Sequence, residues 1–505
     1  MGFIASSWVR IPPCPPFFLS KGANSMTSTF LNQLLNFPSP FIDKSSKHKI
    51  CINLLNQVEV KEFIDSQHEA VQLQIKQTGF NGTAGTQTIL RDEDALVKTI
   101  LIGYDDDLSI YTLSSVFAFI QDSFSANFIS STTFTIDEKN LDTDQLDKLC
   151  TGWGIAAYKF DAHKKDKNAK PAPLLVWPKN ANQDFITAQV SSICLIRNLI
   201  NTPPNILGTD ELTQVAQEVA KKFKAKTKII KDEELQKQNF PLIYTVGKAS
   251  PRRPQLVDMT WGKKTNPKLT IVGKGIIYDT GGLNLKPGMY MRDMKKDMGG
   301  AAHALGLAWI IMALKLPIQL RVLLPIAENS VAGNSYRPGD ILTSRKGLSV
   351  EIGDTDAEGR LVVADALAYA SEDNPELMID FCTLTGAARV ALGYDIPAFF
   401  SNKEDIIDSL RKSSVEEHDP VWPLPLWKGY MKDIQTPIAD LCNDGKGRAG
   451  AIYGGLFLEA FVGDDIDWVH LDCYAWEQTG KAGRPQGGAD TGMRAIFKML
   501  QTRYT

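Results

Sequence analysis

From residue 269 onward, short runs of apolar residues alternate with longer segments whose apolar positions recur at helical spacing. The short runs predict buried strands, and the periodic segments between them predict helices. Strands are expected at 269–273, 319–327 and 377–386, the last running into a loop, with helices at 299–316 and 361–372. Such an alternation of strands and helices is typical of a largely parallel sheet covered on both faces.

The pattern is different nearer the N-terminus. Residues 40–165 mix short apolar runs with polar turns, which predicts a small α/β domain. The chain then becomes charged and proline-containing, so we expect a linker region at 166–184. The fold class that follows is α/β with two domains. The larger one, over 185–505, should contain a mixed, largely parallel central sheet covered by helices.

The first 25 residues follow neither pattern. Their apolar residues are interrupted by four prolines, whereas a signal peptide needs an unbroken apolar helix. We expect residues 1–25 to be a disordered tail or an extension ahead of a true start at Met26. No stretch of about 20 apolar residues is free of charge, so the sequence predicts no membrane span.

Composition narrows the chemistry. The formal net charge is −3 over 505 residues, which does not suggest nucleic acid or an anionic membrane as a partner. The seven cysteines include no CxxC pair, which favours a reducing, cytoplasmic setting and excludes a thiolate zinc site. No two of the six histidines lie within five residues, which excludes HExxH-type sites. Any metal should therefore be held mainly by oxygen atoms.

The octapeptide "DTDAEGRL" concentrates charge, with Asp354, Asp356 and Glu358 at alternate positions before Arg360. A calcium loop is disfavoured, because the twelfth position would be Asp365 rather than a bidentate glutamate and the preceding segment resembles a strand. A second interpretation is a solvated loop at a helix N-terminus, where the helix dipole favours acids. A third is a catalytic metal centre completed by ligands from elsewhere.

A second charged segment could complete such a centre. In extended chain, residues two apart point the same way, so Asp356, Glu358 and Arg360 could face one site. Segment 272–300 is rich in glycine, which lets the backbone bend around a small ligand. It contains Lys274, Asp279, Lys286, Asp293, Lys295, Lys296 and Asp297. Spacing alone does not say which of these converge.

Three separated motifs, "VGKGIIYDTGGLNLKP", "MKKDMGGAA" and "DTDAEGRL", occur in this order, followed by "TLTGA" and "WVHLDCYAW". Together they closely resemble the leucine aminopeptidase family of two-metal cytosolic exopeptidases, from about residue 185 to the C-terminus. The resemblance implies a catalytic metallopeptidase domain at 185–505 that releases N-terminal, leucine-like amino acids from peptides. It also implies two divalent ions per subunit and a homohexamer.

The resemblance implies the ligand set as well. Asp279 and Glu358 would bridge the two ions, Lys274 and Asp297 would complete the tighter site, and Asp356 would complete the exchangeable one. Two dications balance four carboxylates, which could not lie together unpaired. Carboxylate ligands suit zinc, manganese or magnesium, and a lysine ligand must be neutral, which a neighbouring dication favours.

Further roles follow from the same resemblance. Lys286 would assist the carbonyl oxygen as negative charge develops, and Arg360 would hold a bicarbonate ion that acts as general base. The substrate side chain would lie against Met294, Thr383 and Gly386, and an adaptable methionine suits leucine.

One departure leaves the leucine preference open. Asp354 stands where the family commonly has asparagine, and the added charge could strengthen metal binding or shift the pocket toward polar or cationic residues. Two alternatives remain at this point: a two-metal dipeptidase of the Cys-Gly type, and a non-catalytic scaffold or DNA-binding relative of the same fold.

Overall fold

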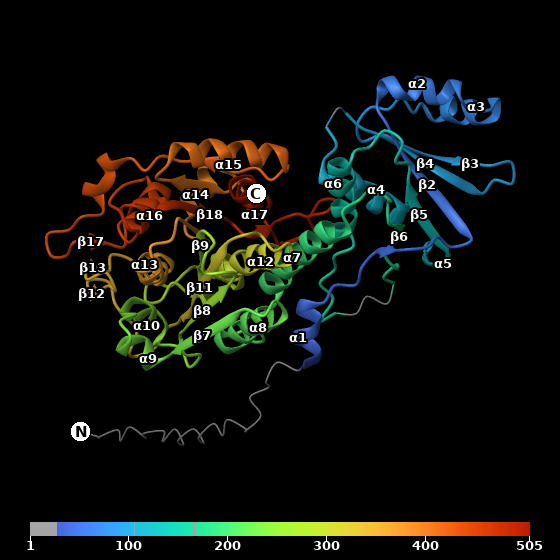
Figure 1. Cartoon of the computed structure of the whole chain (residues 1–505). Coiled ribbons are helices and arrows are strands. Elements are labelled where there is room, and N and C mark those ends of the chain that lie inside the picture. The colour runs from blue at the N-terminus through green and yellow to red at the C-terminus, as the bar shows by residue number, and fades with distance from the viewer. Residues whose placement is uncertain (1–27, 106, 165–167) are drawn as a thin grey trace, which may run out of the picture.

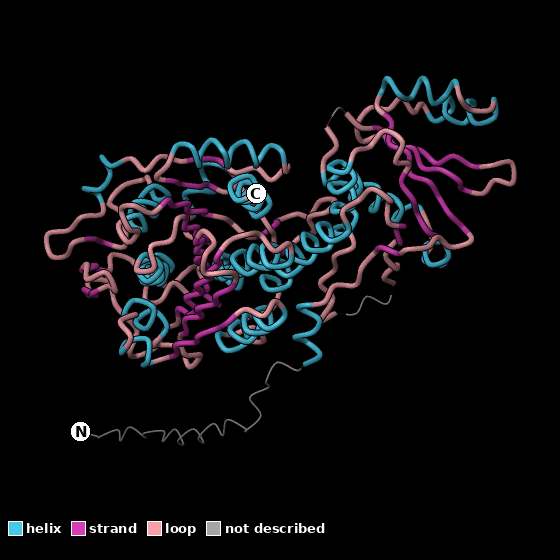
Figure 2. The backbone as a smooth tube through the Cα atoms, viewed as in Figure 1, coloured by secondary structure: helices cyan, strands magenta, loops and turns pink. Residues whose placement is uncertain are grey.

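The computed structural model describes residues 28–105, 107–164 and 168–505, so the prediction for residues 1–25 lies outside the described residues. Two separate sheets, each accompanied by helices, make up most of it (Figures 1 and 2). The predicted fold class is confirmed: a smaller N-terminal α/β domain precedes a larger one. No helix among these residues is long and apolar enough to cross a membrane.

The N-terminal sheet has six strands in the order β1-β6-β5-β2-β4-β3, and only the β3–β4 pair is antiparallel. The strands are β1 (Phe41–Ile42), β2 (His48–Leu55), β3 (Gln87–Arg91), β4 (Val97–Gly103), β5 (Thr132–Ile136) and β6 (Leu174–Val176). The strand β6 falls inside the segment predicted as a linker, so this sheet extends beyond residue 165.

Alternation along these strands places helices on both faces. Leu101 packs with α2 (Gln57–Asp65) and α3 (Glu69–Thr78), whereas Ile100 and Ile102 pack in the main core. Neighbouring strand residues point to opposite faces, which explains this division. The other helices of the domain are α4 (Ile110–Ser123), α5 (Ala126–Ser131) and α6 (Thr143–Ala156), and α1 (Ser28–Leu35) packs near α7 (Gln183–Asn201).

The larger sheet runs β16-β15-β18-β14-β9-β11-β8-β7, with β10 added to β11. Its centre is parallel and its flanks contain antiparallel pairs. The strands are β7 (Lys226–Lys231), β8 (Gln255–Trp261), β9 (Lys268–Gly273), β10 (Gly275–Asp279), β11 (Gln319–Asn329), β14 (Leu377–Cys382), β15 (Ala398–Ser401), β16 (Trp422–Pro423) and β18 (Asp467–Asp472). Short strands elsewhere are β12 (Ile341–Thr343), β13 (Ser349–Glu351), β17 (Leu441–Cys442), β19 (Trp476–Glu477) and β20 (Gly487–Gly488).

Helices cover both faces of this sheet (Figure 1). One face packs against α7, α8 (Thr209–Lys222), α12 (Gly299–Ala313) and α17 (Met493–Tyr504), and the other against α10 (Pro241–Gly247), α13 (Glu358–Ser371) and α16 (Gly450–Glu459). The remaining helices are α9 (Glu233–Lys237), α11 (Gly288–Met291), α14 (Gly386–Leu392), α15 (Glu404–Glu416) and the 3-10 turns η1 (Met294–Met298) and η2 (Lys428–Asp433). The helix α12 is apolar around its whole circumference because it lies between the sheet and α7.

Candidate metal centre

The carboxyl ends of the central strands bring the charged motifs together. β9 ends at Gly273 and the chain turns at Lys274 before β10, which ends at Asp279. Thr383 directly follows β14, and Asp297 lies on η1 just before α12. Ligands of open α/β sheets bind at this edge, so the strand order itself places these side chains at one site.

The ammonium group of Lys274 contacts two carboxylates, those of Asp297 and Glu358. Its Nζ atom lies 2.8 Å from Asp297 Oδ2 and 3.0 Å from Glu358 Oε1, and it donates to the carbonyl oxygen of Thr383 at 3.1 Å. The Thr383 hydroxyl donates to Asp297 Oδ1 at 2.7 Å. The lysine is 3% exposed, so the motifs around residues 274, 297 and 358 meet in a buried cluster.

Two further carboxylates, those of Asp279 and Asp356, join this cluster beside Glu358. Oxygen atoms of Asp279, Asp356 and Glu358 are all within 4.8 Å of one another. Lys286 Nζ lies 2.9 Å from Asp279 Oδ2 and also pairs with Asp356. All five predicted ligands and Lys286 are therefore brought together by the fold.

The pKa values reflect this crowding. Burial opposes the charge on Lys274, but Asp297, Glu358 and Asp279 outweigh it and raise the pKa of that lysine. Burial and Asp279 raise the pKa of Asp356 to about 7, and the same two causes raise the pKa of Glu358 well above its usual range. Each acid resists ionisation mainly because burial disfavours its charged form, and also because its neighbours are negative.

The cluster fits a pair of metal ions. Four carboxylates face two ammonium groups, so the protein alone supplies too little positive charge. Within the described ranges, Glu358 Oε2 is buried without a hydrogen-bond partner, and Glu358 Oε1, Asp297 Oδ2 and Asp356 Oδ1 are buried with only a lysine ammonium group beside them. Buried polar atoms are normally partnered, and divalent cations would supply the missing partners.

The backbone around residues 354–360 differs from the prediction. Glu358 and Arg360 lie in the first turn of α13 rather than in extended chain, and Asp356 lies in the preceding turn. The argument that alternate residues face one way is therefore wrong here. Asp356 and Glu358 still meet, while Arg360 does not line the cavity described next.

A cavity of 480 Å³ opens onto the carboxylates. Met294, Thr383 and Gly386, the predicted side-chain subsite, all line it together with the five ligands and Lys286. Asp354 does not line it; its carboxylate accepts the backbone N–H of Asp356 at 2.8 Å. The charge of Asp354 therefore shapes the turn before α13 rather than the wall of the cavity.

Sequence reasoning missed the residues that hold these loops in place. Asn329, at the end of β11, donates to Asp279 Oδ1 at 2.8 Å and to the carbonyl oxygen of Thr355 at 3.0 Å. The Thr355 hydroxyl donates to the carbonyl oxygen of Gly281 at 2.6 Å, which ties the first motif to the third. A polar residue two positions after the buried run 319–327 was the available signal for Asn329.

A second missed group supports the loop after β14. Asp472, at the end of β18, accepts the backbone N–H groups of Leu384 at 2.8 Å and Thr385 at 3.2 Å, and it also accepts the Thr385 hydroxyl. This carboxylate fixes one wall of the cavity. Its position at a strand end, in "HLDCYAW", was the available signal.

Another buried cluster lies within the sheet, on the neighbouring strands β14 and β18. Asp380 Oδ1 lies 2.6 Å from His470 Nδ1 and 3.2 Å from Cys382 Sγ, and Oδ2 accepts the indole N–H of Trp468 at 2.8 Å. Burial raises the pKa of the Cys382 thiol well above its usual range. Because the Asp380 oxygens already have donors, this cluster is a hydrogen-bonded core network.

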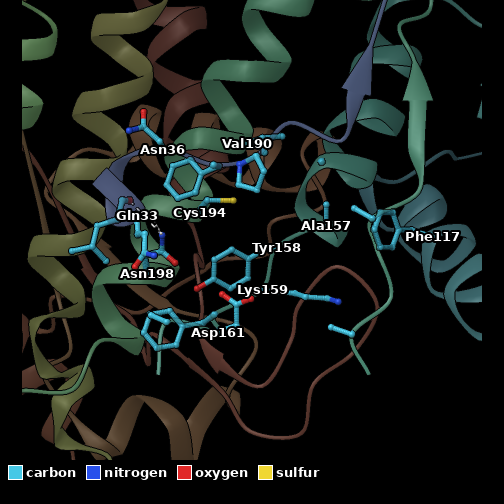
Figure 3. A pocket seen from close by; sticks show the side chains of 18 of the residues that line it. Gln33, Asn36, Phe117, Ala157, Tyr158, Lys159, Asp161, Val190, Cys194 and Asn198 are labelled. Atoms are coloured by element: carbon cyan, nitrogen blue, oxygen red, sulfur yellow. Dashed lines mark hydrogen bonds between the residues drawn. The ribbon is translucent and has the colours of Figure 1, made fainter. Parts of the chain in front are cut away.

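A second cavity, of 370 Å³, lies beside α1 and α7 (Figure 3). Tyr158, Cys194 and Asn198 line it, and none of its lining residues belongs to the carboxylate cavity. The Tyr158 hydroxyl accepts a hydrogen bond from Asn201 at 3.0 Å. Burial raises the pKa of the Cys194 thiol to about 12, which makes it unreactive.

Comparison with known proteins points to a single family. The sequence model of the catalytic domain of the cytosol aminopeptidase family matches residues 194–497, and that of the M17 aminopeptidase N-terminal domain matches residues 50–178. A probable cytosol aminopeptidase of Syntrophotalea carbinolica is 36% identical over 375 residues, which covers 71% of this chain and 75% of that protein. One from Geobacter sp. is 32% identical over 443 residues, covering 84% and 90%.

Solved structures agree with the sequence relatives. The crystal structure of a cytosol aminopeptidase from Coxiella burnetii superimposes with a TM-score of 0.85 at 39% identity, covering 92% of this chain and 100% of that one. The bottromycin maturation enzyme BotP, solved in complex with Mn, shares the fold with a TM-score of 0.80 at 24% identity, covering 90% and 99%.

Proposed function

Because the chain belongs to the cytosol aminopeptidase family, and is thus a metal-dependent exopeptidase, we propose that it cleaves peptides at the buried carboxylate cluster. Lys274 and Asp297 would hold the tighter of two divalent ions and Asp356 the exchangeable one, with Asp279 and Glu358 shared between them. Zinc or manganese is the proposed metal, and magnesium is compatible with the same oxygen-rich donors. The ions would supply Lewis-acid chemistry, which activates water and polarises the peptide carbonyl.

Lys286 is the residue best placed to act on the substrate. Its ammonium group lines the cavity beside Asp279 and Asp356. Burial opposes its charge, whereas the neighbouring carboxylates of Asp279 and Glu358 outweigh burial and raise its pKa. A fixed ammonium group at this point can donate to the carbonyl oxygen as negative charge develops there.

Arg360 is suited to holding a small anion. Its Nε and Nη1 atoms are buried and have no hydrogen-bond partner among the residues the structure describes. A buried guanidinium with free donors binds planar carboxylate-like anions in a bidentate manner. We therefore propose that it holds bicarbonate, which would take the proton that the attacking water loses.

The proposal includes the N-terminal residue that is released. Met294, Thr383 and Gly386 would contact the substrate's side chain, and the thioether of Met294 suits a leucine-type residue. We also propose that the protein acts in the cytoplasm as a homohexamer.

The observation that carries this proposal is the convergence of Lys274, Asp297 and Glu358 in one buried cluster. The test is hydrolysis of leucine p-nitroanilide by metal-free protein to which zinc or manganese is added back, with an N-acetylated substrate as control. Activity is expected only with metal and a free α-amine. Hydrolysis that survives exhaustive chelation, or no hydrolysis with either metal, would contradict it.

A further inference from the structure

The cavity next to the carboxylates carries charge of both signs. Beyond the metal ligands, its wall includes two cations that flank one aromatic ring. Lys296 Nζ lies 4.8 Å from the centroid of the Tyr474 ring, and the guanidinium carbon of Arg389 lies 4.6 Å from the same centroid. We call Lys296, Arg389 and Tyr474 the cationic end of the cavity.

Neither cation has an acidic partner within ion-pair distance in the described part of the chain. Across the ranges that the structure describes, Lys296 and Arg389 make no ion pair and no side-chain hydrogen bond, although Lys296 is only 2% exposed. The adjacent Asp297 is already engaged by Lys274 and Thr383. Contact with an aromatic face compensates a buried cation only in part, and an unpaired buried charge is costly. Such a charge facing a cavity suggests that a ligand supplies the anion.

The cationic end adjoins the proposed side-chain subsite. Lys296 is on the same 3-10 turn as Met294, two residues further along. Arg389 is on α14 three residues after Gly386, and a Cβ atom placed on that glycine would lie 3.4 Å from Arg389 Nη2. The subsite thus continues from the thioether of Met294 to two positive charges, the order in which a glutamate side chain presents its methylenes and its carboxylate.

We propose that the cationic end binds a carboxylate of the substrate, and that this carboxylate is the side chain of an N-terminal aspartate or glutamate. The inference rests on the aminopeptidase function proposed above and extends its substrate range beyond leucine. A dipeptide's C-terminal carboxylate offers the same chemistry. We favour the side chain because Lys296 shares η1 with Met294 and Arg389 shares α14 with Gly386, and these are residues of the proposed side-chain subsite.

The test compares kcat/KM for the p-nitroanilides of glutamate, aspartate and leucine in the metal-loaded protein. These substrates carry no C-terminal carboxylate. The wild type is expected to hydrolyse the acidic substrates. Lys296→Met and Arg389→Gln should each lower the glutamate-to-leucine ratio by about tenfold or more, because the charge that selects glutamate is removed. Lys296→Glu should invert the preference toward lysine p-nitroanilide.

Lys295→Met is the matched control. Lys295 is the preceding lysine, but it donates to the carbonyl oxygen of Asn201 at 2.8 Å and does not line the cavity. Its substitution should leave the glutamate-to-leucine ratio within about twofold, since its charge lies outside the subsite. Circular dichroism verifies that each variant is folded, and the half-buried Arg389 provides the decisive variant if Lys296→Met is unstable.

The outcomes separate the two proposals. If no substrate is hydrolysed with zinc or manganese, the aminopeptidase function is wrong. If leucine is released but glutamate and aspartate are not, or if neither variant changes the ratio, only the acidic subsite is wrong. If the variants instead weaken cleavage of Leu-Gly relative to Leu-Gly-amide and leave the glutamate ratio unchanged, the cations bind the C-terminal carboxylate, and the side-chain assignment is overturned.

Discussion

At the scale of single residues, Glu358 is a buried acid whose charge the protein balances poorly. It is buried at the first turn of α13, and both of its oxygens lack a hydrogen-bond partner in the described part of the chain. Its contact is the ammonium of Lys274 at 3.0 Å, which is shared with Asp297. A carboxylate in this position destabilises the protein unless cations join it. We therefore expect Glu358 to serve metal binding rather than folding.

Replacing Glu358 by glutamine tests this role. Glu358→Gln removes one negative charge and one ligand that we assign to both ions, so metal content should fall below two ions per chain and kcat/KM should fall at least about a hundredfold. Melting temperature of the metal-free protein should not fall, because the lost charge was repelled by Asp279. Metal content by mass spectrometry is the measurement. Asp293→Asn, a change at a cavity carboxylate outside the ligand set, should keep two ions.

A residue outside the site gives a pH-dependent prediction. Burial raises the pKa of Asp147 to about 6, although its Oδ1 accepts the backbone N–H of Asn182 at 2.7 Å. The folded state thus binds this proton more tightly than the unfolded state does. Its stabilising contribution is complete below about pH 4 and is lost as pH rises through 6.

Asp147→Asn keeps an acceptor oxygen but cannot ionise. The variant should therefore gain melting temperature relative to the wild type as pH rises from 4 to 7, by about 2–4 °C at pH 7. Thermal melts across this range are the measurement, and the exposed Asp65→Asn is the control. An identical pH profile for wild type and Asp147→Asn would show that the side chain is not desolvated.

At the scale of elements, the sequence predicted the parts whose pattern is local. The buried strands near 269, 319 and 377 and the helix near 299 were placed within a few residues, because a continuous apolar run or a helical period needs no knowledge of partners. The strand β6 was missed because three apolar residues between prolines, just after a charged stretch, are too few to show a period. It is a strand only because β1 and β5 pair with it.

The site was predicted unevenly for a similar reason. The proposed metal ligands were predicted by resemblance, and the fold brings these side chains together. Lys296 and Arg389 were not recognised as cavity residues, since a lysine or arginine in a sequence is usually exposed. In the folded protein, η1 and α14 bring these two side chains to the Tyr474 ring. Their role depends on where the fold places them, and the spacing of residues along the sequence does not reveal this.

The packing of α13 against the end of β9 gives an element-scale prediction. Gly359 leaves room for Lys274: a Cβ atom there would lie 2.3 Å from Lys274 Cε and 2.5 Å from Nζ. Gly359→Ala favours the helix intrinsically, yet it should displace the lysine and lower kcat/KM by about a hundredfold or more. Activity and metal content are measured alongside helical content. Gly333→Ala, with nothing within 4 Å of the new atom, is the control.

An active Gly359→Ala protein with two bound ions would contradict the placement of Lys274 among the ligands. If helical content falls along with activity, the packing of α13 rather than the position of Lys274 would explain the loss. The Gly333→Ala control shows how much an added methyl group costs in open space.

At the scale of the whole molecule, one helix connects the two α/β domains. The helix α7 packs against α6 of the N-terminal domain and against α12 of the larger one, so the apolar core is continuous across both (Figure 1). Among the residues that the structure describes, however, the carboxylate cavity is lined only by residues from 274 onward. The described part of the N-terminal domain therefore adds no residue to the cavity of its own chain, and we expect this domain to contribute to stability or assembly.

The proposed homohexamer is the prediction that belongs to this scale. Trp427, Tyr430 and Ile438 are exposed within one short segment around η2, Trp427 by 62%. Large apolar side chains gathered in one exposed segment are typical of surfaces that become buried on association. Sedimentation velocity should give a species of six 55.8 kDa chains, and Trp427→Ser should shift it toward smaller species because it removes an aromatic anchor. Val390→Ser, at another exposed apolar position, is the control, because Val390 lies outside this segment. A monomer at micromolar concentration would contradict the hexamer, whereas a hexamer that Trp427→Ser leaves intact would contradict only the part given to this segment.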